Sequence, residues 1–508
     1  MKKLIFLFIG LVSMSTINAQ NISDVLRYSE NEIQGTARFR ALSGAFGALG
    51  GDMSAVSLNP AGSAIFNSSH ASISLSNNQK NNDVNYFNGS NSSSNSDFNV
   101  NQAGVAIVLK NRRQDSDWKK TVFGFSYDRT NNFNDDWLAS GTNPTNSIDS
   151  YFIQTTMNQE IPFGVLKLQP GEYIEEAYAD IGAYYGYDFQ QAFLGYWSGI
   201  IDPVNMDNDT NDDNIDYLSN IASGTFNQEY SYSSTGYNGK FSFNLATQYK
   251  ENFFIGINLN SHFINYDRFT GFYESNSNEG SLVNNVIFDN FINTNGTGFS
   301  FQLGGILKIT PEFRAGLSYD SPTWYTVYEE LIQNIDSNYA DPEIDYISNI
   351  VNLFPYYKLQ TPSKLTGSLA YVFNKQGLIS FDYSRKNYSK IKLKPTSDDY
   401  FANLNNNING SLKSTSTYRI GGEYKLKLLS LRAGYRMEES PYENGSTIGD
   451  LTGYSFGLGY AFGNTKLDLT YDRSERETKY QLFDIGLTDT ANLNTKNNNF
   501  TLSLSFNL

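Results

Sequence analysis

Phe500-Thr-Leu-Ser-Leu-Ser-Phe-Asn-Leu508 closes the chain, and apolar and polar side chains alternate along it without exception. Side chains of a β-strand point to opposite faces in turn. The segment is therefore predicted to be a strand with one apolar and one polar face. Both a membrane-spanning barrel and a soluble sandwich contain such strands, so the rest of the chain has to distinguish them.

Fourteen segments of this kind can be recognised, each about as long as the roughly 9–11 residues that a tilted strand needs to cross a bilayer. Their approximate ranges are 69–79, 98–110, 119–130, 237–250, 252–272, 296–309, 312–325, 361–374, 377–391, 413–427, 428–438, 450–463, 465–480 and 496–508. Short turns, expected on the periplasmic side, alternate with long loops. The longest loop, 131–236, is expected to hold short helices such as 171–187.

Eight charged residues in these segments each lie in the phase opposite the apolar set of their own strand. The positions are Lys110, Asp128, Lys308, Arg314, Asp382, Arg419, Arg432 and Asp468. A Lys or Arg facing lipid costs about 2–4 kcal/mol at mid-bilayer, so a protected apolar face fits a membrane barrel. We predict an all-β fold, a transmembrane antiparallel 14-stranded up-and-down β-barrel over residues 69–508. Its last strand pairs with its first, so that Ile73 and Leu75 lie on the outer face. A secreted multi-domain all-β protein is the alternative.

Export is indicated by Met1-Lys2-Lys3 and an apolar run that ends near Asn18-Ala19-Gln20, which together resemble a signal peptide over residues 1–19. The chain has no cysteine, so disulfides and thiolate sites are excluded. With 52 acidic and 37 basic residues, nucleic acid is an unfavourable partner. An exported, aromatic-rich chain of this composition indicates the outer membrane of a Gram-negative bacterium.

The N-terminal segment, residues 20–68, does not alternate and is rich in small residues. It contains Arg38-Phe39-Arg40, then Gly44-Ala-Phe46-Gly47-Ala-Leu-Gly50-Gly51-Asp52, then Asn59-Pro60-Ala61-Gly62. Small residues let backbone segments approach closely, so this segment can fold inside a lumen as a plug, which we call the hatch. A mobile exported leader is the alternative interpretation.

The run from Gly35 to Phe66 resembles the N-terminal hatch of the outer-membrane long-chain fatty acid transporter family, in the version found in Bacteroidetes-type bacteria. This resemblance implies a 14-stranded barrel with a short hatch, in agreement with the strand count. By the same likeness, the hatch motif comprises Asn59, Pro60, Ala61 and Gly62, together with Gly47, Gly50 and Gly51.

The resemblance implies passive uptake of a hydrophobic ligand of the fatty acid class, by binding, hatch movement and lateral release into the outer-membrane lipids. We expect a monomer without a cofactor. Candidate ligand-binding residues are Arg38, Phe39, Arg40, Phe46, Phe193, Trp197, Trp324 and Tyr325. For the aromatic residues, the alternative roles are loop packing or the interfacial girdle. For the two arginines, the alternative is an ion pair with a lumenal aspartate.

Catalytic and metal motifs lack the context that they need. Gly453-Tyr-Ser-Phe-Gly457 lies in the middle of a predicted strand, and His262 is predicted to face the lumen, so we expect no enzyme. The acidic segment 207–216 begins like a calcium loop but lacks its glycine and final glutamate. Two other functions stay open: a barrel serving protein export, similar to type IX secretion shuttles, and a general porin.

Overall fold

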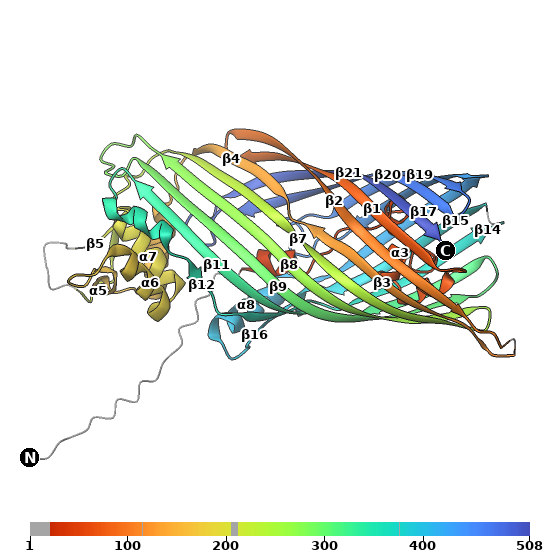
Figure 1. The fold of residues 1–508 in the computed structure, drawn as a ribbon. Helices are drawn as coiled ribbons and strands as arrows, with labels where there is room; N and C mark the ends of the chain where they lie inside the picture. The colour runs from red at the N-terminus through yellow and green to blue at the C-terminus, as the bar shows by residue number, and fades with distance from the viewer. Residues whose placement is uncertain (1–20, 114, 205–211, 375) are drawn as a thin grey trace, which may run out of the picture.

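A closed β-barrel forms the body of the computed structural model, which describes residues 21–113, 115–204, 212–374 and 376–508 (Figure 1). The fourteen alternating segments form strands that pair antiparallel with their neighbours around the barrel. β21 pairs with β1 from Asn507–His70 to Asn492–Asn85, which closes the barrel. The predicted fold class is confirmed. The signal peptide expected over 1–19 lies outside the described residues.

The spanning strands are β1 His70–Tyr86, β2 Gly89–Lys110, β3 Trp118–Asn132, β7 Phe226–Tyr249, β8 Phe253–Ser275, β9 Asn285–Lys308, β10 Phe313–Asp320, β14 Lys364–Phe373, β15 Gly377–Asn387, β17 Ser414–Leu426, β18 Leu429–Glu438, β19 Leu451–Phe462, β20 Thr465–Gln481 and β21 Thr490–Asn507. Five further strands extend the sheet at the end with the long loops: β4 Asp135–Asn143, β11 Trp324–Ser337, β12 Asn352–Leu353, β13 Tyr357–Gln360 and β16 Lys392–Lys394. We call this the long-loop end and the opposite one the short-turn end.

An apolar band surrounds the outer face of the barrel, and β8 shows its height. Outward positions of β8 are apolar from Phe253 to Leu259 and at Phe263, and they become polar at Asn265. Ten residues of tilted strand span about 25 Å, the height of the apolar band of outer-membrane barrels. The inward positions, such as Asn258 and Asn260, are polar and buried.

Several strands continue far beyond the apolar band, which the sequence did not predict. β7 begins at Phe226 and β9 at Asn285, each eleven residues before the predicted start. The loop predicted over 131–236 is accordingly reduced to 144–225, because β4 and the first part of β7 lie within the predicted range. Alternation ends where the outer face becomes polar, so the sequence signal ends there as well.

Helices cover the long-loop end of the barrel, where they lie at the left of Figure 1. They are α4 Asp149–Gln159, α5 Phe163–Leu166, α6 Ile174–Tyr185, α7 Tyr187–Trp197 and the 3-10 helix η2 Pro342–Asn349, next to the ribbon of β5 Ile201–Pro203 and β6 Tyr217–Ser219. α6 falls within the helix expected over 171–187. Buried side chains of these helices pack against Trp137, Phe272 and Phe288 of the strands. Among the described residues, no helix is long and apolar enough to cross a membrane.

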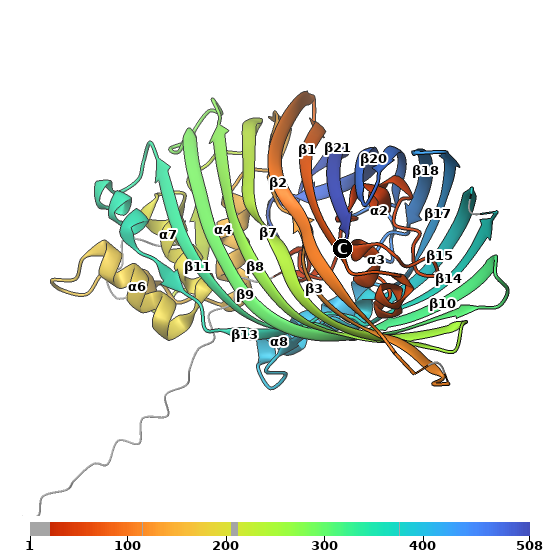
Figure 2. The ribbon, with the colours of Figure 1, turned by 45° about the vertical axis from the view of Figure 1, so that its right-hand side comes forward.

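The N-terminal segment lies inside the lumen, as predicted, and Figure 2 shows its helices α2 and α3 within the barrel. Its elements are α1 Ile22–Arg27, α2 Ala37–Ala41, α3 Met53–Val56 and the 3-10 helix η1 Pro60–Ile65. Side chains cap all four: Asn21 for α1, Thr36 for α2, Asp52 for α3 and Asn59 for η1. These caps satisfy backbone N–H groups that short helices would otherwise leave without partners.

The barrel wall is interrupted at one level, where a single strand was predicted over 312–325. That prediction is wrong, because β10 ends at Asp320 and the chain resumes as β11 after Ser321-Pro322-Thr323. Pro362 stands in the corresponding break between β13 and β14. Proline has no N–H to donate to a ladder, which accounts for both breaks. Past this level, α8 Asp399–Ser411 and the 3-10 helix η3 Tyr388–Lys390 accompany β16, and Phe401, Leu404 and Ile408 of α8 join a buried cluster with Val25 and Leu26 of α1.

Closure of the barrel can be tested by one engineered disulfide. The Ser76 and Thr501 hydroxyl oxygens lie 2.7 Å apart across the β1–β21 ladder. In the double variant Ser76→Cys/Thr501→Cys, the sulfur atoms are therefore placed to bond. We expect complete oxidation and a cross-linked species on a denaturing gel, in a chain that has no other cysteine. Free thiols in the folded double variant would contradict this closure.

Candidate functional site

Glycines on the inner wall make room for the hatch. A Cβ atom on Gly316 of β10 would lie 2.3 Å from the Gly47 carbonyl oxygen, and one on Gly434 of β18 would lie 2.5 Å from the Leu42 carbonyl carbon. The other glycines of the wall in such close contact with the hatch are Gly104, Gly256, Gly304, Gly421 and Gly457. We call these seven positions the glycine bed. Without a side chain, these glycines let the backbone of the hatch approach the wall closely.

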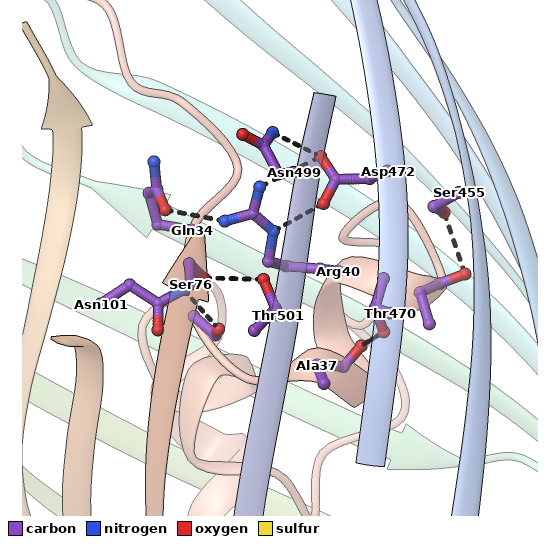
Figure 3. A network of polar contacts seen from close by, with 12 residues as sticks. Gln34, Ala37, Arg40, Ser76, Asn101, Ser455, Thr470, Asp472, Asn499 and Thr501 are labelled. Atoms are coloured by element: carbon purple, nitrogen blue, oxygen red, sulfur yellow. Dashed lines mark hydrogen bonds and ion pairs between the residues drawn. The ribbon is translucent and has the colours of Figure 1, made fainter. Parts of the chain in front are cut away.

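An ion pair inside the barrel fixes α2 of the hatch to β20. Arg40 is 1% exposed, and its Nε and Nη2 atoms donate to the two carboxylate oxygens of Asp472 over 2.8 and 3.0 Å (Figure 3). Gln34 accepts the third guanidinium bond, and Asn499 donates to Asp472. Such a bidentate pair fixes direction as well as distance. For Arg40, this is the alternative role considered from the sequence, an ion pair with a lumenal aspartate.

The neighbouring Arg38 enters a larger charge network. Its Nε donates to Glu423 of β17 over 2.9 Å, and Arg432 donates to Glu423 and to Asp468 over 2.6 Å each. Burial opposes the charged form of Arg38, but Glu423 outweighs that effect and raises the pKa of the guanidinium above its usual range. Arg38 also lies over the ring of Phe46, 5.2 Å from its centroid. Both arginines thus hold the hatch against the wall.

The hatch motif is a set of close backbone contacts. Asn59 donates to the carbonyl oxygens of Gly47 and Gly305 over 2.7 and 3.1 Å and accepts from the Ala61 N–H. Pro60 occupies the first turn of η1. Gly50 and Gly51 have positive φ angles of 61° and 69°, and a Cβ on Gly62 would approach Gly50 within 3.2 Å. Each glycine is therefore required by backbone geometry.

A cavity of 160 Å³ lies between the hatch and the wall strands β3, β7, β8 and β9. Its larger apolar side chains are Tyr28, Ile33, Phe39, Leu58 and Tyr325. Lys240 and Arg419 also line it, and neither makes an ion pair or hydrogen bond with any residue in the described ranges. We call it the first cavity; its lining mixes these apolar side chains with polar and charged ones, and two of its cations, Lys240 and Arg419, are not held in an ion pair within the described chain.

A second cavity, of 300 Å³, lies on the other side of the hatch, towards β1, β20 and β21. Its lining is polar and includes Lys80, Asp97, Asn132 and Arg476. Hatch residues 31–34, between α1 and α2, border both cavities, and Glu30 borders only the second. This short segment is therefore the partition between the two cavities.

The candidate ligand-binding residues lie in four places. Phe39 and Tyr325 line the first cavity, and Arg38, Arg40 and Phe46 belong to the anchored part of the hatch. Trp324 is on the outer face, 42% exposed. Phe193 is fully buried in α7, and the Trp197 indole donates to the Leu166 carbonyl within the loop helices.

Some residues of the site were missed, and one predicted loop cannot be judged. Lys240 was not singled out, although its place in the polar phase of β7 would have placed it in the lumen. His262 faces the lumen as predicted, where its Nε2 lies 2.8 Å from the Ser300 hydroxyl. Of the acidic segment 207–216, residues up to 211 lie outside the described ranges, and Asp212 pairs with Lys167 over 2.6 Å.

The wall has a seam where backbone pairing stops. The β2–β3 ladder runs from Lys110–Lys120 to Gln102–Asp128, and residues 89–101 of β2 pair with β1 alone within the described chain. Side chains bridge the seam instead: Asn132 donates to Asp97 over 2.7 Å, and Arg129 lies 3.8 Å from the same carboxylate. Asp97 and Asn132 also line the second cavity.

Solved structures of other proteins share this architecture. The solved structure of a Pseudomonas aeruginosa FadL homologue aligns with 13% identity over 94% of this chain and 99% of that chain, with a TM-score of 0.56. The Pseudomonas putida toluene transporter TodX aligns over the same shares with 13% identity and a TM-score of 0.50. At these identities the likeness concerns the fold alone. No curated protein sequence matches the chain significantly.

A family model supplies the assignment that the fold alone does not. The model described as outer membrane protein transport protein (OMPP1/FadL/TodX) matches residues 214–507, more than half of the chain. The match covers the barrel from the end of the helical loop onwards and leaves out the hatch. The family and the structural neighbours are transporters and not enzymes. With its fourteen-stranded barrel, its lumenal hatch and this match, the chain belongs to the OMPP1/FadL/TodX family of outer-membrane transport proteins.

Proposed function

We propose that the protein is a passive outer-membrane channel for long-chain fatty acids or other hydrophobic compounds. The ligand would bind in the first cavity, segment 30–34 would move, and the ligand would leave sideways through the seam between β2 and β3. The first cavity is the observation that carries this proposal, because apolar and cationic side chains meet there beneath the loop helices.

The size of the first cavity argues for a movement of the hatch. A cavity of 160 Å³ is close to the roughly 150 Å³ that accommodates benzene. A monoaromatic compound therefore fits as the cavity stands, whereas a long acyl chain does not. Displacement of segment 30–34 would join the first cavity to the second, of 300 Å³, and provide the length that a fatty acid needs.

Two of the five cations that line the first cavity, Lys240 and Arg419, favour a ligand with an acidic end. Lys240 is buried directly opposite Asp128 in the β3–β7 ladder, and Arg419 is opposite Asp382 in the β15–β17 ladder, yet neither pair is in contact. A carboxylate ligand would supply the missing charge-assisted hydrogen bonds. These would complement Lys240, which is buried, and Arg419, which is half-buried, while the chain contacts Phe39 and Tyr325.

The seam supports lateral release because its closure depends on side chains. Breaking a backbone ladder costs several hydrogen bonds at once, whereas Asp97, Arg129 and Asn132 can separate by rotation of their side chains. The second cavity reaches Asp97 and Asn132 from the inside. A ligand in the joined cavities would thus reach the seam, where the wall is easiest to open.

Uptake of labelled oleate and labelled toluene by cells that lack their own channel tests the proposal. We expect both compounds to enter faster when this chain is present. In Lys240→Gln, oleate uptake at limiting concentration should fall about tenfold or more, because a charge-assisted hydrogen bond contributes about 1.5–3 kcal/mol. Toluene uptake should not change. Lys479→Gln, which alters an exposed lysine of β20, is the matched control.

A cross-link tests the exit. Cysteines at Asp97 and Asn132, joined by a short thiol-reactive reagent, should block uptake of both compounds. The Ser76→Cys/Thr501→Cys disulfide lies in a continuous ladder and should leave uptake intact. Free passage through the cross-linked seam would rule out this exit while leaving the channel function standing. Absence of uptake for every hydrophobic compound tested would instead favour a role in protein export.

A further inference from the structure

We propose that a row of lysines on the outer face of β13 and β16 binds the phosphate groups of an anionic lipid in the outer leaflet. The row consists of Lys358, Lys392 and Lys394, with Lys390 next to it in η3. The proposal does not depend on which compound the channel carries.

Strand register places the three lysines together on the outer face. Lys358 and Lys394 are direct partners in the β13–β16 ladder, and Lys392 is the partner of Gln360 two residues away. Between them, Leu359 and Leu393 are paired and fully buried, so they point to the opposite side. Lys358 and Lys392 are exposed and Lys394 is half-buried.

This arrangement is unfavourable unless an anion is added. Like charges directly opposite each other in a ladder destabilise the pair. No carboxylate of the described residues forms an ion pair with any of the three lysines; Lys394 donates instead to the Gln360 side chain over 3.2 Å. The structure thus leaves three positive charges side by side without a counter-charge.

The height of the row matches the lipid headgroup layer. Trp324 of β11 is paired with Phe299 of β9, the last outward apolar residue before Thr297 and Asn295. Gln360 is paired with Trp324, and Lys358 follows two residues further on, about 7 Å along the strand. The lysines therefore begin at the edge of the apolar band, where headgroups lie.

Aromatic residues and charge distribution favour a lipid over a soluble anion. Tyr328 and Tyr356 lie beside the row with ring centroids 6.0 Å apart and are 53% and 63% exposed. Exposed aromatic residues at this level are typical of membrane interfaces. The large loop 144–225 at the same end contains thirteen acidic residues and one lysine. The lysine row is thus a local basic patch at the membrane edge of an acidic surface.

Lipid retention by the full-length protein tests the proposal. We expect native mass spectrometry from phosphatidylcholine nanodiscs doped with lipid A to show retained lipid A. The triple variant K358Q/K392Q/K394Q should bind it about a hundredfold more weakly, on the usual contribution of a lysine at an anionic membrane surface. The control K167Q/K479Q/K496Q removes three lysines elsewhere at the long-loop end and should retain it. Equal retention by the triple variant, or equally tight binding of inorganic phosphate to the wild type, would overturn the proposal.

Unfolding temperatures of the wild type and the variants, measured with and without lipid A, give a second test of the site. In pure phosphatidylcholine, K358Q should unfold at a higher temperature than the wild type, because the repulsion from Lys394 is removed. Added lipid A should raise the unfolding temperature of the wild type and leave that of the triple variant unchanged. A lower unfolding temperature of K358Q together with equal stabilisation of both proteins by lipid A would contradict the proposed site.

Discussion

Gly316→Val is expected to unseat the hatch and let small hydrophilic solutes pass through a barrel that still folds and inserts. The Cβ of any residue at this position would lie 2.3 Å from the Gly47 carbonyl oxygen, and valine adds two further methyl groups. Overpacking of this kind costs about 1–3 kcal/mol where the surroundings cannot move. The strand itself keeps its ladders to β9 and β14, so the cost falls on the hatch.

Conductance in planar bilayers and sensitivity of cells to hydrophilic antibiotics measure this effect. Gly367→Val is the matched control, because a Cβ at Gly367 of the neighbouring strand β14 meets no atom within 4 Å. The control should remain closed. A folded Gly316→Val barrel with unchanged conductance would show that the hatch can shift within its seat. The glycine bed would then not be what positions it.

Asp472→Asn is expected to release α2 of the hatch from the wall. Removing one partner of a buried ion pair leaves the other charge uncompensated, at a cost of about 3–5 kcal/mol. Arg40 is 1% exposed and could not regain water without leaving its place. Hydrogen exchange and limited proteolysis of residues 34–41 should therefore increase, while the barrel strands stay protected.

A double-mutant cycle separates the ion pair from other effects of these substitutions. Arg40→Met/Asp472→Leu replaces both charges by apolar side chains and should be less destabilising than either single change. The partly exposed pair Arg473–Glu475, 3.8 Å apart, serves as control, and Arg473→Met should cost less than about 1 kcal/mol. Additive effects of the two changes at Arg40 and Asp472 would mean that the pair does not anchor the hatch.

The membrane-spanning part of the fold was predictable because lipid imposes a rule on every second residue. Charged positions such as Asp382, Arg432 and Asp468 stayed in the polar phase, and the structure buries all three in the lumen. The same rule explains where prediction stopped. Where the outer face meets water, alternation is no longer required, and β7 and β9 each begin eleven residues before the start that the sequence predicts.

The candidate site was predictable in outline and not in its contacts. The small residues of segment 35–66 indicated a compact hatch, and Arg38 and Arg40 were its evident charges. Their partners, Glu423 and Asp472, lie 385 and 432 residues away along the chain. No local pattern encodes such distances. The first cavity likewise depends on how segment 30–34 crosses the lumen, and only the closed barrel shows that Lys240 lines this cavity outside any ion pair of the described residues.

The sequence by itself determined the strand number, the direction of each face and the presence of a small-residue hatch, because lipid contact and backbone crowding act on each residue separately. The strand from Phe500 to Asn507 needed only its alternation to be recognised. Tertiary structure alone decided the seating of the hatch, the two cavities, the seam beside Asp97 and the lysine row of β13 and β16. Each of these depends on strand register and on contacts between distant segments, and those are properties of the closed barrel.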